Sequence, residues 1–301
     1  MRVLIAYDGS ESSNEARDLV AAIEWPPGSE LRIATAYAPF LPGSFAPDEL
    51  YDPATPEAVF EADRQAAEDR AKAAAGGIGR PTATVTWAAV HGRPASVVLD
   101  EAAAWSADLI VVGTRGLGPF TAALLGSVSE EIIDHATCPV LVVRRPSIER
   151  VVLAEDGSAG ARTATAVLAW PIFASSRVRV VTVSEAPARL EDDIGAAGPG
   201  RVDPALDDRR RMVKAALAAV EARAQSTADR LTAAGLATEI DVRHGDPAHE
   251  IIRAATDWEA DLIVMGTRGR TGLERLLLGS VARKVLQHAP CSVLIERAPA
   301  Q

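Results

Sequence analysis

Short apolar segments alternate with amphipathic segments along the chain, and this alternation predicts strands and helices in turn. The order expected for the first half is strand Arg2–Tyr7, helix Glu11–Glu24, strand Leu31–Tyr37, helix Glu57–Ala75, strand Thr82–Val90, helix Pro94–Trp105, strand Leu109–Val112, helix Gly126–His135 and strand Val140–Val143. Strands that alternate with helices form right-handed βαβ units, so we expect a parallel sheet with helices on both faces.

The second half repeats this order. Its expected elements are strand Val151–Ala154, helix Arg162–Ala169, strand Val178–Ser184, helix Pro204–Ala234, strand Ala237–Val242, helix Ala248–Trp258, strand Leu262–Met265, helix Gly279–His288 and strand Val293–Ile295. A repeat of about 150 residues has the length of a whole domain. We therefore expect two homologous domains, residues 1–146 and 147–301.

Two glycine motifs occupy equivalent places in these domains, 153 residues apart (279 − 126 = 153). Gly113-Thr114-Arg115-Gly116 is followed by nine residues and Gly126-Ser127-Val128, and Gly266-Thr267-Arg268-Gly269 by nine residues and Gly279-Ser280-Val281. Each motif joins an apolar strand to a helix. Backbone N–H groups can gather around a phosphate at such a turn, so the repeat suggests two nucleotide sites.

The composition narrows the choice of partners. The formal net charge is −10, whereas a nucleic-acid partner usually requires a basic face. The sequence has no run of 18 apolar residues and no apolar leader with a cleavage site, and its two cysteines lack metal-ligand spacing. We expect a cytoplasmic protein that binds neither nucleic acid nor membranes and holds no metal through its own residues.

The glycine motifs resemble the signature of the universal stress protein family in its nucleotide-binding branch: Gly, two residues, Gly, nine residues, Gly, then Ser or Thr. Further matches are Asp8-Gly9-Ser10 and Asp156-Gly157-Ser158 after the first strands, and the Gly-x-Pro turns at Gly92 and Gly245. The resemblance covers essentially the entire chain. It implies two Rossmann-like α/β domains, each a five-stranded parallel sheet flanked by helices, that bind ATP.

The resemblance also implies a role for individual residues. Asp8 and Asp156 would bond the nucleoside, and the backbones of Ala36 and Val183 would meet the adenine edge. The glycines would let the chain pass close to the ribose and phosphates, and Gly-Ser-Val would hold the phosphates. The expected ATP-binding residues are Asp8, Ala36, Val112, Gly113, Arg115, Gly116, Gly126, Ser127 and Val128 in the first domain, and Asp156, Val183, Met265, Gly266, Arg268, Gly269, Gly279, Ser280 and Val281 in the second.

Several alternatives stay open. The glycines could serve only close helix–strand packing, and Asp8 and Asp156 could be ordinary helix N-caps. The sequence has no Gly-Lys-Ser/Thr of a P-loop and no visible nucleophile–base pair. We therefore expect no catalytic residues and a nucleotide-dependent regulator of the stress response, with slow ATP hydrolysis at most. The rival functions are a slow ATP-hydrolysing or adenylyl-transferring enzyme and a nucleotide-free scaffold.

The resemblance further implies that the two domains form an internal pseudo-dimer, in which Val140–Val143 pairs with Val293–Ile295. Burying two apolar edge strands would also favour solubility. A homodimer of the whole chain is a further expectation. The protein partners and the need for Mg²⁺ are left open by the sequence.

The two copies differ in ways that affect ATP affinity. Arg270 and Arg275 lie inside the second glycine loop, whereas the first has Leu117-Gly118-Pro119-Phe120, so we predict that the second domain binds ATP at least as tightly. Glu155 in place of Tyr7 beside the aspartate would weaken ATP binding by the second domain, and the sequence leaves open which of the two effects is larger. Calorimetric titration of Gly126→Asp and Gly279→Asp with ATP measures each remaining site, and equal residual affinities would contradict the idea.

Overall fold

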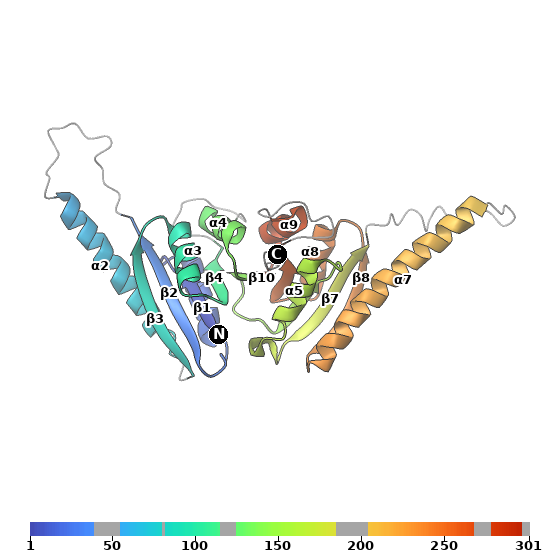
Figure 1. Cartoon of the computed structure of the whole chain (residues 1–301), viewed down its shortest axis with the longest axis horizontal. Coiled ribbons are helices and arrows are strands. Elements are labelled where there is room, and N and C mark those ends of the chain that lie inside the picture. Colours follow the sequence, from blue (N-terminus) through green and yellow to red (C-terminus); the bar gives the residue numbers. More distant parts are fainter. Residues whose placement is uncertain (39–54, 80–81, 115–124, 185–203, 268–277, 297–301) are drawn as a thin grey trace, which may run out of the picture. The chain divides into compact units, whose positions relative to one another are not determined.

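The computed structural model describes residues 1–38, 55–79, 82–114, 125–184, 204–267 and 278–296. Contacts within the chain divide it into two compact units, Met1–Pro146 (unit one) and Ser147–Gln301 (unit two). Each unit alternates strands with helices, as the apolar pattern predicts (Figure 1).

Unit one contains five strands and four helices among its described residues. They are β1 (Arg2–Ala6), α1 (Glu11–Ala22), β2 (Ser29–Tyr37), α2 (Thr55–Gly76), β3 (Ala83–His91), α3 (Pro94–Ala104), β4 (Leu109–Gly113), α4 (Ser127–His135) and β5 (Val140–Val143).

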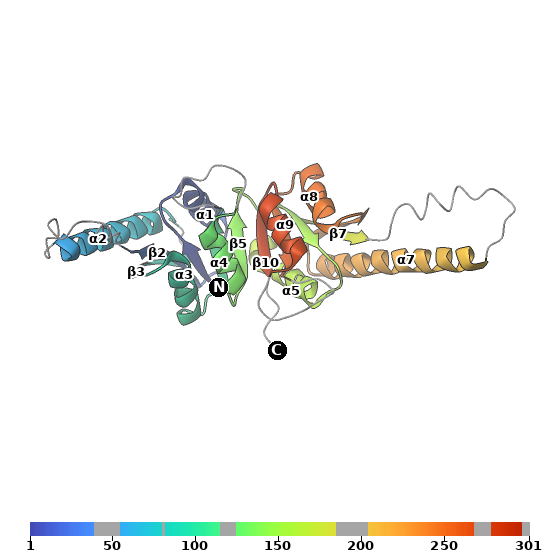
Figure 2. The same cartoon turned by 90° about the horizontal axis from the view of Figure 1, so that it is seen from above.

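The sheet of unit one has the order β3-β2-β1-β4-β5, and every pairing is parallel. The central strand β1 pairs with β2 through Ala6 and Ala34 and with β4 through Ile5 and Val111. Val3, Leu4 and Ile5 are fully buried, because helices cover both faces of the sheet. Figure 2 shows α1 on one side of this sheet and α3 on the other.

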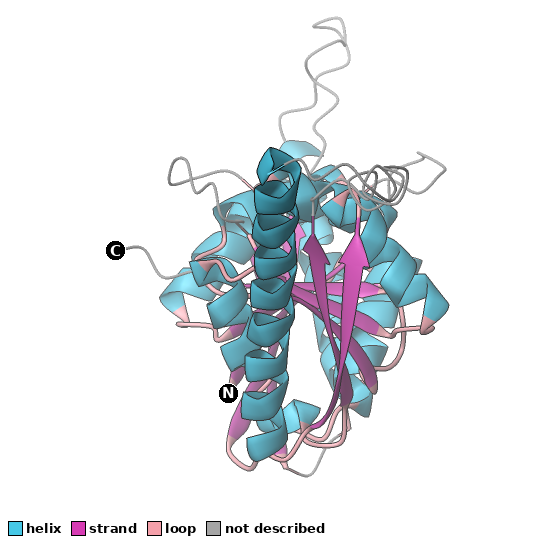
Figure 3. Ribbon diagram, turned by 90° about the vertical axis from the view of Figure 1, so that its right-hand side faces the viewer, coloured by secondary structure: helices cyan, strands magenta, loops and turns pink. Residues whose placement is uncertain are grey.

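Unit two repeats this architecture, with an additional 3-10 turn, η3. Its described elements are β6 (Arg150–Ala154), α5 (Ala159–Val167), η3 (Pro171–Phe173), β7 (Arg177–Ser184), α7 (Pro204–Ala233), β8 (Ala237–His244), α8 (Pro247–Asp257), β9 (Leu262–Gly266), α9 (Ser280–His288) and β10 (Ser292–Glu296). Its strands follow the equivalent parallel order, β8-β7-β6-β9-β10. The long helix α7 runs along β7 and β8 (Figure 3).

The predicted fold class is confirmed: both units are α/β, with a parallel five-stranded sheet flanked by helices. The largest error in a described boundary concerns α5, which begins at Ala159 rather than Arg162. Ser158 caps this helix, since its Oγ accepts a hydrogen bond from the N–H of Ala161 at 3.0 Å. No helix in the described part of the chain is long and apolar enough to cross a membrane.

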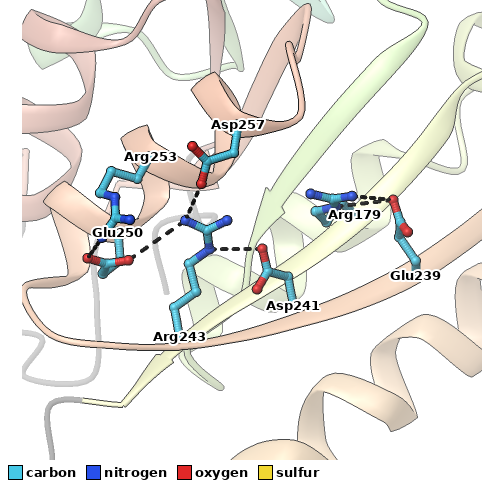
Figure 4. Close-up of polar contacts among 7 residues, drawn as sticks. All are labelled: Arg179, Glu239, Asp241, Arg243, Glu250, Arg253 and Asp257. Carbon is cyan, nitrogen blue, oxygen red and sulfur yellow. Dashed lines mark hydrogen bonds and ion pairs between the residues drawn. The ribbon is translucent and has the colours of Figure 1, made fainter. Parts of the chain in front are cut away.

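A network of charged residues joins α8 to the outer strand β8 of unit two (Figure 4). Arg243 Nε donates to Asp241 Oδ2 at 2.8 Å, and Arg243 Nη1 donates to Asp257 Oδ2 at 3.0 Å. Arg243 Nη1 also lies 3.8 Å from Glu250 Oε2, and Arg253 Nη1 donates to Glu250 Oε1 at 3.2 Å. The Arg243 side chain is only 15% exposed, so one half-buried cation serves three carboxylates.

Replacing the cation at the centre of this network should destabilise unit two. We expect Arg243→Gln to lower the free energy of unfolding by about 2 kcal/mol, because the Asp241 and Glu250 carboxylates would lose their half-buried partner. Urea unfolding measures this cost. The control is Glu239→Gln, which removes the charge of one carboxylate that is 45% exposed and pairs with Arg179 alone among the described residues (Arg179 Nη2 to Glu239 Oε1, 3.0 Å), and it should cost less than about 1 kcal/mol. Equal costs for the two variants would contradict the prediction.

Candidate functional site

The turn after the first strand of each unit has the same backbone geometry. Asp8 Oδ1 accepts from the N–H of Ser10, and Asp156 Oδ1 from the N–H of Ser158, both at 2.9 Å. The intervening Gly9 and Gly157 have φ of +86° and +79°, a conformation that favours glycine. The helix N-caps are Ser10 and Ser158, so the alternative that the aspartates cap these helices is wrong.

Ala36 lies where β2 extends beyond the end of β1, and Val183 lies where β7 extends beyond the end of β6. The pairing of β1 with β2 stops at Ala34, whose carbonyl accepts from the N–H of Tyr7 at 2.9 Å. In a parallel strand, the backbone groups of residues two apart point to the same neighbour, so those of Ala36 also point toward β1, beyond its end. The same relation holds for Val183, because Val181 O accepts from the N–H of Glu155 at 2.8 Å. Within the described residues, each unit thus has a stretch of strand backbone at this edge that extends beyond its pairing with the neighbouring strand.

The first glycine of each motif is required by packing. A Cβ on Gly113 would lie 2.6 Å from the backbone carbon and oxygen of Ser12 on α1, and a Cβ on Gly266 would lie 2.5 Å from the backbone of Gly160 on α5. No side chain fits at these distances. The packing alternative therefore accounts for Gly113 and Gly266 without a ligand. The preceding strand residues, Val112 and Met265, are buried.

The second part of each motif starts a helix. Gly126 and Gly279 are the N-caps of α4 and α9, and as glycines they provide no side-chain cap. The N–H of Gly126 donates to Thr114 O at 2.7 Å, and the N–H of Gly279 donates to Thr267 O at 2.8 Å. Each bond holds the helix start beside the end of the strand before the loop. Ser127 and Ser280 are exposed, and Val128 and Val281 are half-buried.

These features gather at one edge of each sheet. In unit one, β1 lies between β2 and β4. Asp8, Ala36 and Gly113 therefore lie at or just beyond the carboxyl ends of three adjacent strands. The bond between Gly126 and Thr114 brings the start of α4 to the same edge. The carboxyl ends of parallel strands, at the point where strand order reverses, are where ligands bind in open α/β sheets. The predicted residues Arg115, Gly116, Arg268 and Gly269 lie outside the described residues.

Sequence reasoning missed an arginine that packs on the Asp-Gly-Ser turn of each unit. Arg70 Cδ lies 2.9 Å from where a Cβ on Gly9 would be, and Arg223 Cδ lies 2.8 Å from the same point on Gly157. The Nε atoms of both arginines are buried without a hydrogen-bond partner among the described residues. The two arginines are 153 residues apart (223 − 70 = 153), on α2 and α7, and this spacing was the available signal.

The residue before each aspartate differs between the units. Tyr7 in unit one donates its hydroxyl to Asn14 Oδ1 at 2.8 Å. Glu155 in unit two is buried, its Oε1 accepts from the N–H of Gly157 at 2.6 Å, and Arg223 Nε lies 3.6 Å from the same oxygen. Burial raises the pKa of Glu155 despite the bond from Gly157 and the charge of Arg223. Unit two therefore places a buried carboxyl, that of Glu155, beside the half-buried carboxyl of Asp156.

Three aromatic rings cluster where β2 and β3 of unit one end. The ring centroids of Tyr37 and His91 lie 5.6 Å apart, and Phe60 of α2 lies 5.6 Å from Tyr37 and 5.2 Å from His91. Ser184 ends β7 in the place that Tyr37 has at the end of β2, so unit two does not repeat this cluster. Within the described ranges, no three His, Cys, Asp or Glu side chains are placed to hold a metal ion.

The packing of Gly113 and Gly266 can be tested without any ligand. We expect Gly113→Ala and Gly266→Ala each to lower the free energy of unfolding by about 2 kcal/mol, because the added methyl group would collide with helix backbone. Denaturant unfolding in the absence of nucleotide measures the effect. Gly76→Ala, whose methyl group would meet nothing within 4 Å, is the control and should leave stability unchanged or raise it by up to about 1 kcal/mol, as expected for a glycine in a helix. Unaltered stability of both test variants would refute the close contact.

Comparison with known proteins gives the family. A model of the universal stress protein family matches residues 1–144 and again residues 147–297. A universal stress protein of Thermus aquaticus is 38% identical over 143 residues, which are 47% of this chain and 97% of that protein. One from Mycobacterium tuberculosis is 32% identical over 199 residues, which are 64% of this chain and 62% of that protein's length.

A solved structure supports the same conclusion for the fold. The crystal structure of a universal stress protein from Archaeoglobus fulgidus matches with a TM-score of 0.68 and 18% sequence identity, and the match covers 98% of both chains. At that identity the likeness concerns the fold alone. The family model, however, matches nearly the whole sequence. The chain therefore belongs to the universal stress protein family and carries two of its domains in tandem.

Proposed function

We propose that each unit binds one ATP molecule and that the protein acts in the cytoplasm as a nucleotide-dependent regulator of the stress response. The observation that carries this proposal is a convergence that occurs twice. In each unit a fixed Asp-Gly-Ser turn, a stretch of strand backbone beyond the end of the described strand pairing and a helix start whose N-cap is glycine lie at one edge of the sheet.

The chemistry of these groups suits the parts of a nucleotide. The Asp8 or Asp156 carboxylate accepts hydrogen bonds, as the ribose hydroxyls require. The backbone groups of Ala36 or Val183 offer a donor and an acceptor to the adenine edge. The N–H groups that begin α4 or α9, together with the exposed hydroxyl of Ser127 or Ser280, suit phosphate oxygens.

Binding energy must come from all of these contacts together. A helix start contributes about 0.3–1 kcal/mol toward an anion, more when partly buried. Micromolar affinity needs about 8 kcal/mol. The helix start alone is therefore insufficient, and the proposal requires the adenine, the ribose and the phosphates to bind at once.

Assembly and metal use are also proposals. Strands β5 and β10 each end the strand order of their unit, and we propose that such strands pair, within the chain or between two copies of it. Mg²⁺ would enter with the nucleotide phosphates, not through a cluster of protein ligands.

The direct test is to purify the chain, denature it and identify any released nucleotide, and then to titrate nucleotide-free protein with ATP by calorimetry. We expect two binding events. In the double variant Gly126→Asp, Gly279→Asp, affinity at both sites should fall more than about tenfold, because a carboxylate would stand where the phosphates bind.

The control is Gly79→Asp, which places the same charge at an exposed glycine that has nothing within 4 Å. It should retain both binding events. Failure of the unsubstituted protein to bind ATP, or unchanged binding by the double variant, would exclude the proposed function.

A further inference from the structure

Strand β3 is the edge strand of unit one, because among the described strands of this unit it pairs with β2 alone. The N–H of Gly92 donates to Tyr37 O of β2 at 3.0 Å. Backbone groups in a parallel strand point to alternate sides, so those of the even-numbered residues of β3 point toward β2. The N–H and C=O groups of Val85, Trp87 and Ala89 therefore point outward, along the free edge of the sheet.

This strand lacks the devices by which proteins usually protect an edge. It is nine residues long, and its sequence Ala-Thr-Val-Thr-Trp-Ala-Ala-Val-His contains no Asp, Glu, Lys, Arg or Pro. Trp87, at its centre, is 40% exposed, and within the described ranges only Met212 is another exposed large hydrophobic residue. Charged side chains and prolines normally prevent an edge strand from pairing with a further strand. Strand β3 is therefore open to such pairing.

The equivalent edge strand of unit two is protected by charge. Strand β8 carries Glu239, Asp241 and Arg243 at alternate positions (Figure 4), where β3 has threonine, alanine and valine. Ile240 stands in place of Trp87 (240 − 87 = 153) and is half-buried. The same fold thus accepts charges on this strand, so their absence from β3 is not a requirement of packing.

The charge next to β3 is balanced. Arg32 of β2 donates from Nε to Thr86 Oγ1 at 3.3 Å, and its Nη1 lies 3.3 Å from Glu101 Oε2 of α3. The arginine and the carboxylate form a neutral pair beside the strand. Because the formal net charge of the chain is −10, two copies repel each other unless they meet where charge is low or balanced. The edge formed by β3 meets this condition.

Strand β3 is also complementary to itself. In an antiparallel pair of two copies centred on Trp87, residues whose numbers add to 174 lie opposite each other (87 + 87 = 174 and 85 + 89 = 174). Trp87 then faces Trp87, and Val85 faces Ala89. All three residues have outward-pointing backbone groups, so each opposed pair can exchange N–H···O=C bonds. The two tryptophan rings would be removed from water together, with no charge opposite a like charge.

We propose that two copies of this chain associate through β3, antiparallel and centred on Trp87, so that the sheet of unit one continues into that of the second copy. This inference goes beyond the proposed function and requires no nucleotide. It is also distinct from pairing through β5 and β10, which lie at the opposite end of the strand order of their units. One strand pair is a small interface, so the expected dissociation constant is roughly 1–100 µM.

Sedimentation equilibrium of the full chain, at concentrations that bracket this constant, measures the association. We expect Trp87→Lys to weaken it at least about tenfold, because the variant removes the two rings and places like charges opposite each other. Ala237→Lys puts the same charge at an exposed position of β8 and is the control, which should leave the dissociation constant unchanged. Circular dichroism establishes whether each variant is folded.

Cysteine cross-linking tests the register. Val85→Cys and Ala89→Cys are made in separate chains, mixed and oxidised. Opposed residues in an antiparallel pair have Cα atoms about 5.5 Å apart, within reach of a disulfide, so the mixture should form a cross-linked dimer. Either variant alone should not, because its two cysteines would lie about 13 Å apart along the strands. The unsubstituted chain, which contains Cys138 and Cys291, is the control.

Each failure is informative. A chain that stays monomeric at every concentration overturns the inference, and so does a dimer that Trp87→Lys leaves unaltered, because it would use another surface. Absence of the mixed cross-link, or equal cross-linking of the single variants, overturns it too, and this test decides where Trp87→Lys fails to fold. None of these outcomes affects the proposed function, which nucleotide titration of the unsubstituted chain tests separately.

Discussion

The close approach of the first helix to the end of the fourth strand is the contact on which each candidate site depends. Ser12 in unit one and Gly160 in unit two occupy the space that any Cβ at Gly113 or Gly266 would need. This contact brings the start of α1 or α5, and the Asp-Gly-Ser turn that precedes it, beside the strand that leads into the glycine loop. A larger residue would separate the two halves of the site. The close packing of the fold and the geometry of the candidate site thus depend on the same glycine.

The sequence predicted the order of elements well because each type of element has a strong local pattern. The apolar runs at Leu109 and Leu262 are short and nearly unbroken, as expected for strands buried on both faces. The site was predictable to the extent that it is contiguous: the Asp-Gly-Ser turns and the glycine motifs can be read directly. The family resemblance, rather than the apolar pattern, supplied the ligand roles of these residues.

The remainder of the site depends on residues that are distant in sequence. Arg223 packs on the turn at Gly157, from a helix that begins more than 40 residues later (204 − 157 = 47). The burial of Glu155 also requires that helix, and no local pattern indicates it. Similarly, the predicted start of α5 was wrong because a serine hydroxyl, not the spacing of apolar residues, decides where the helix begins. The pattern of apolar and polar residues along the sequence therefore predicts neither long-range packing nor individual hydrogen bonds.

The two units show which features a duplicated fold can change. Unit two has Asp241, Arg243, Glu250 and Asp257 where unit one has Ala88, Val90, Val97 and Ala104, yet the strand order is the same. Both units also keep an arginine over a tryptophan ring, Arg32 over Trp105 at 4.4 Å and Arg179 over Trp258 at 4.6 Å. Charges at the sheet surface have therefore diverged without altering the backbone.

Because surface side chains can change without altering the backbone, the two candidate sites of the chain can differ. The donors supplied by helix starts and strand ends belong to the backbone, and the shared fold makes them equivalent in both units. Differences between the two candidate sites must then arise from side chains that border each site without building it. Tyr7 and Glu155 are such a pair at the Asp-Gly-Ser turn, and Glu130 and Arg283 are another at the helix start. Because these two pairs lie on different elements, the two ends of each candidate site can change independently.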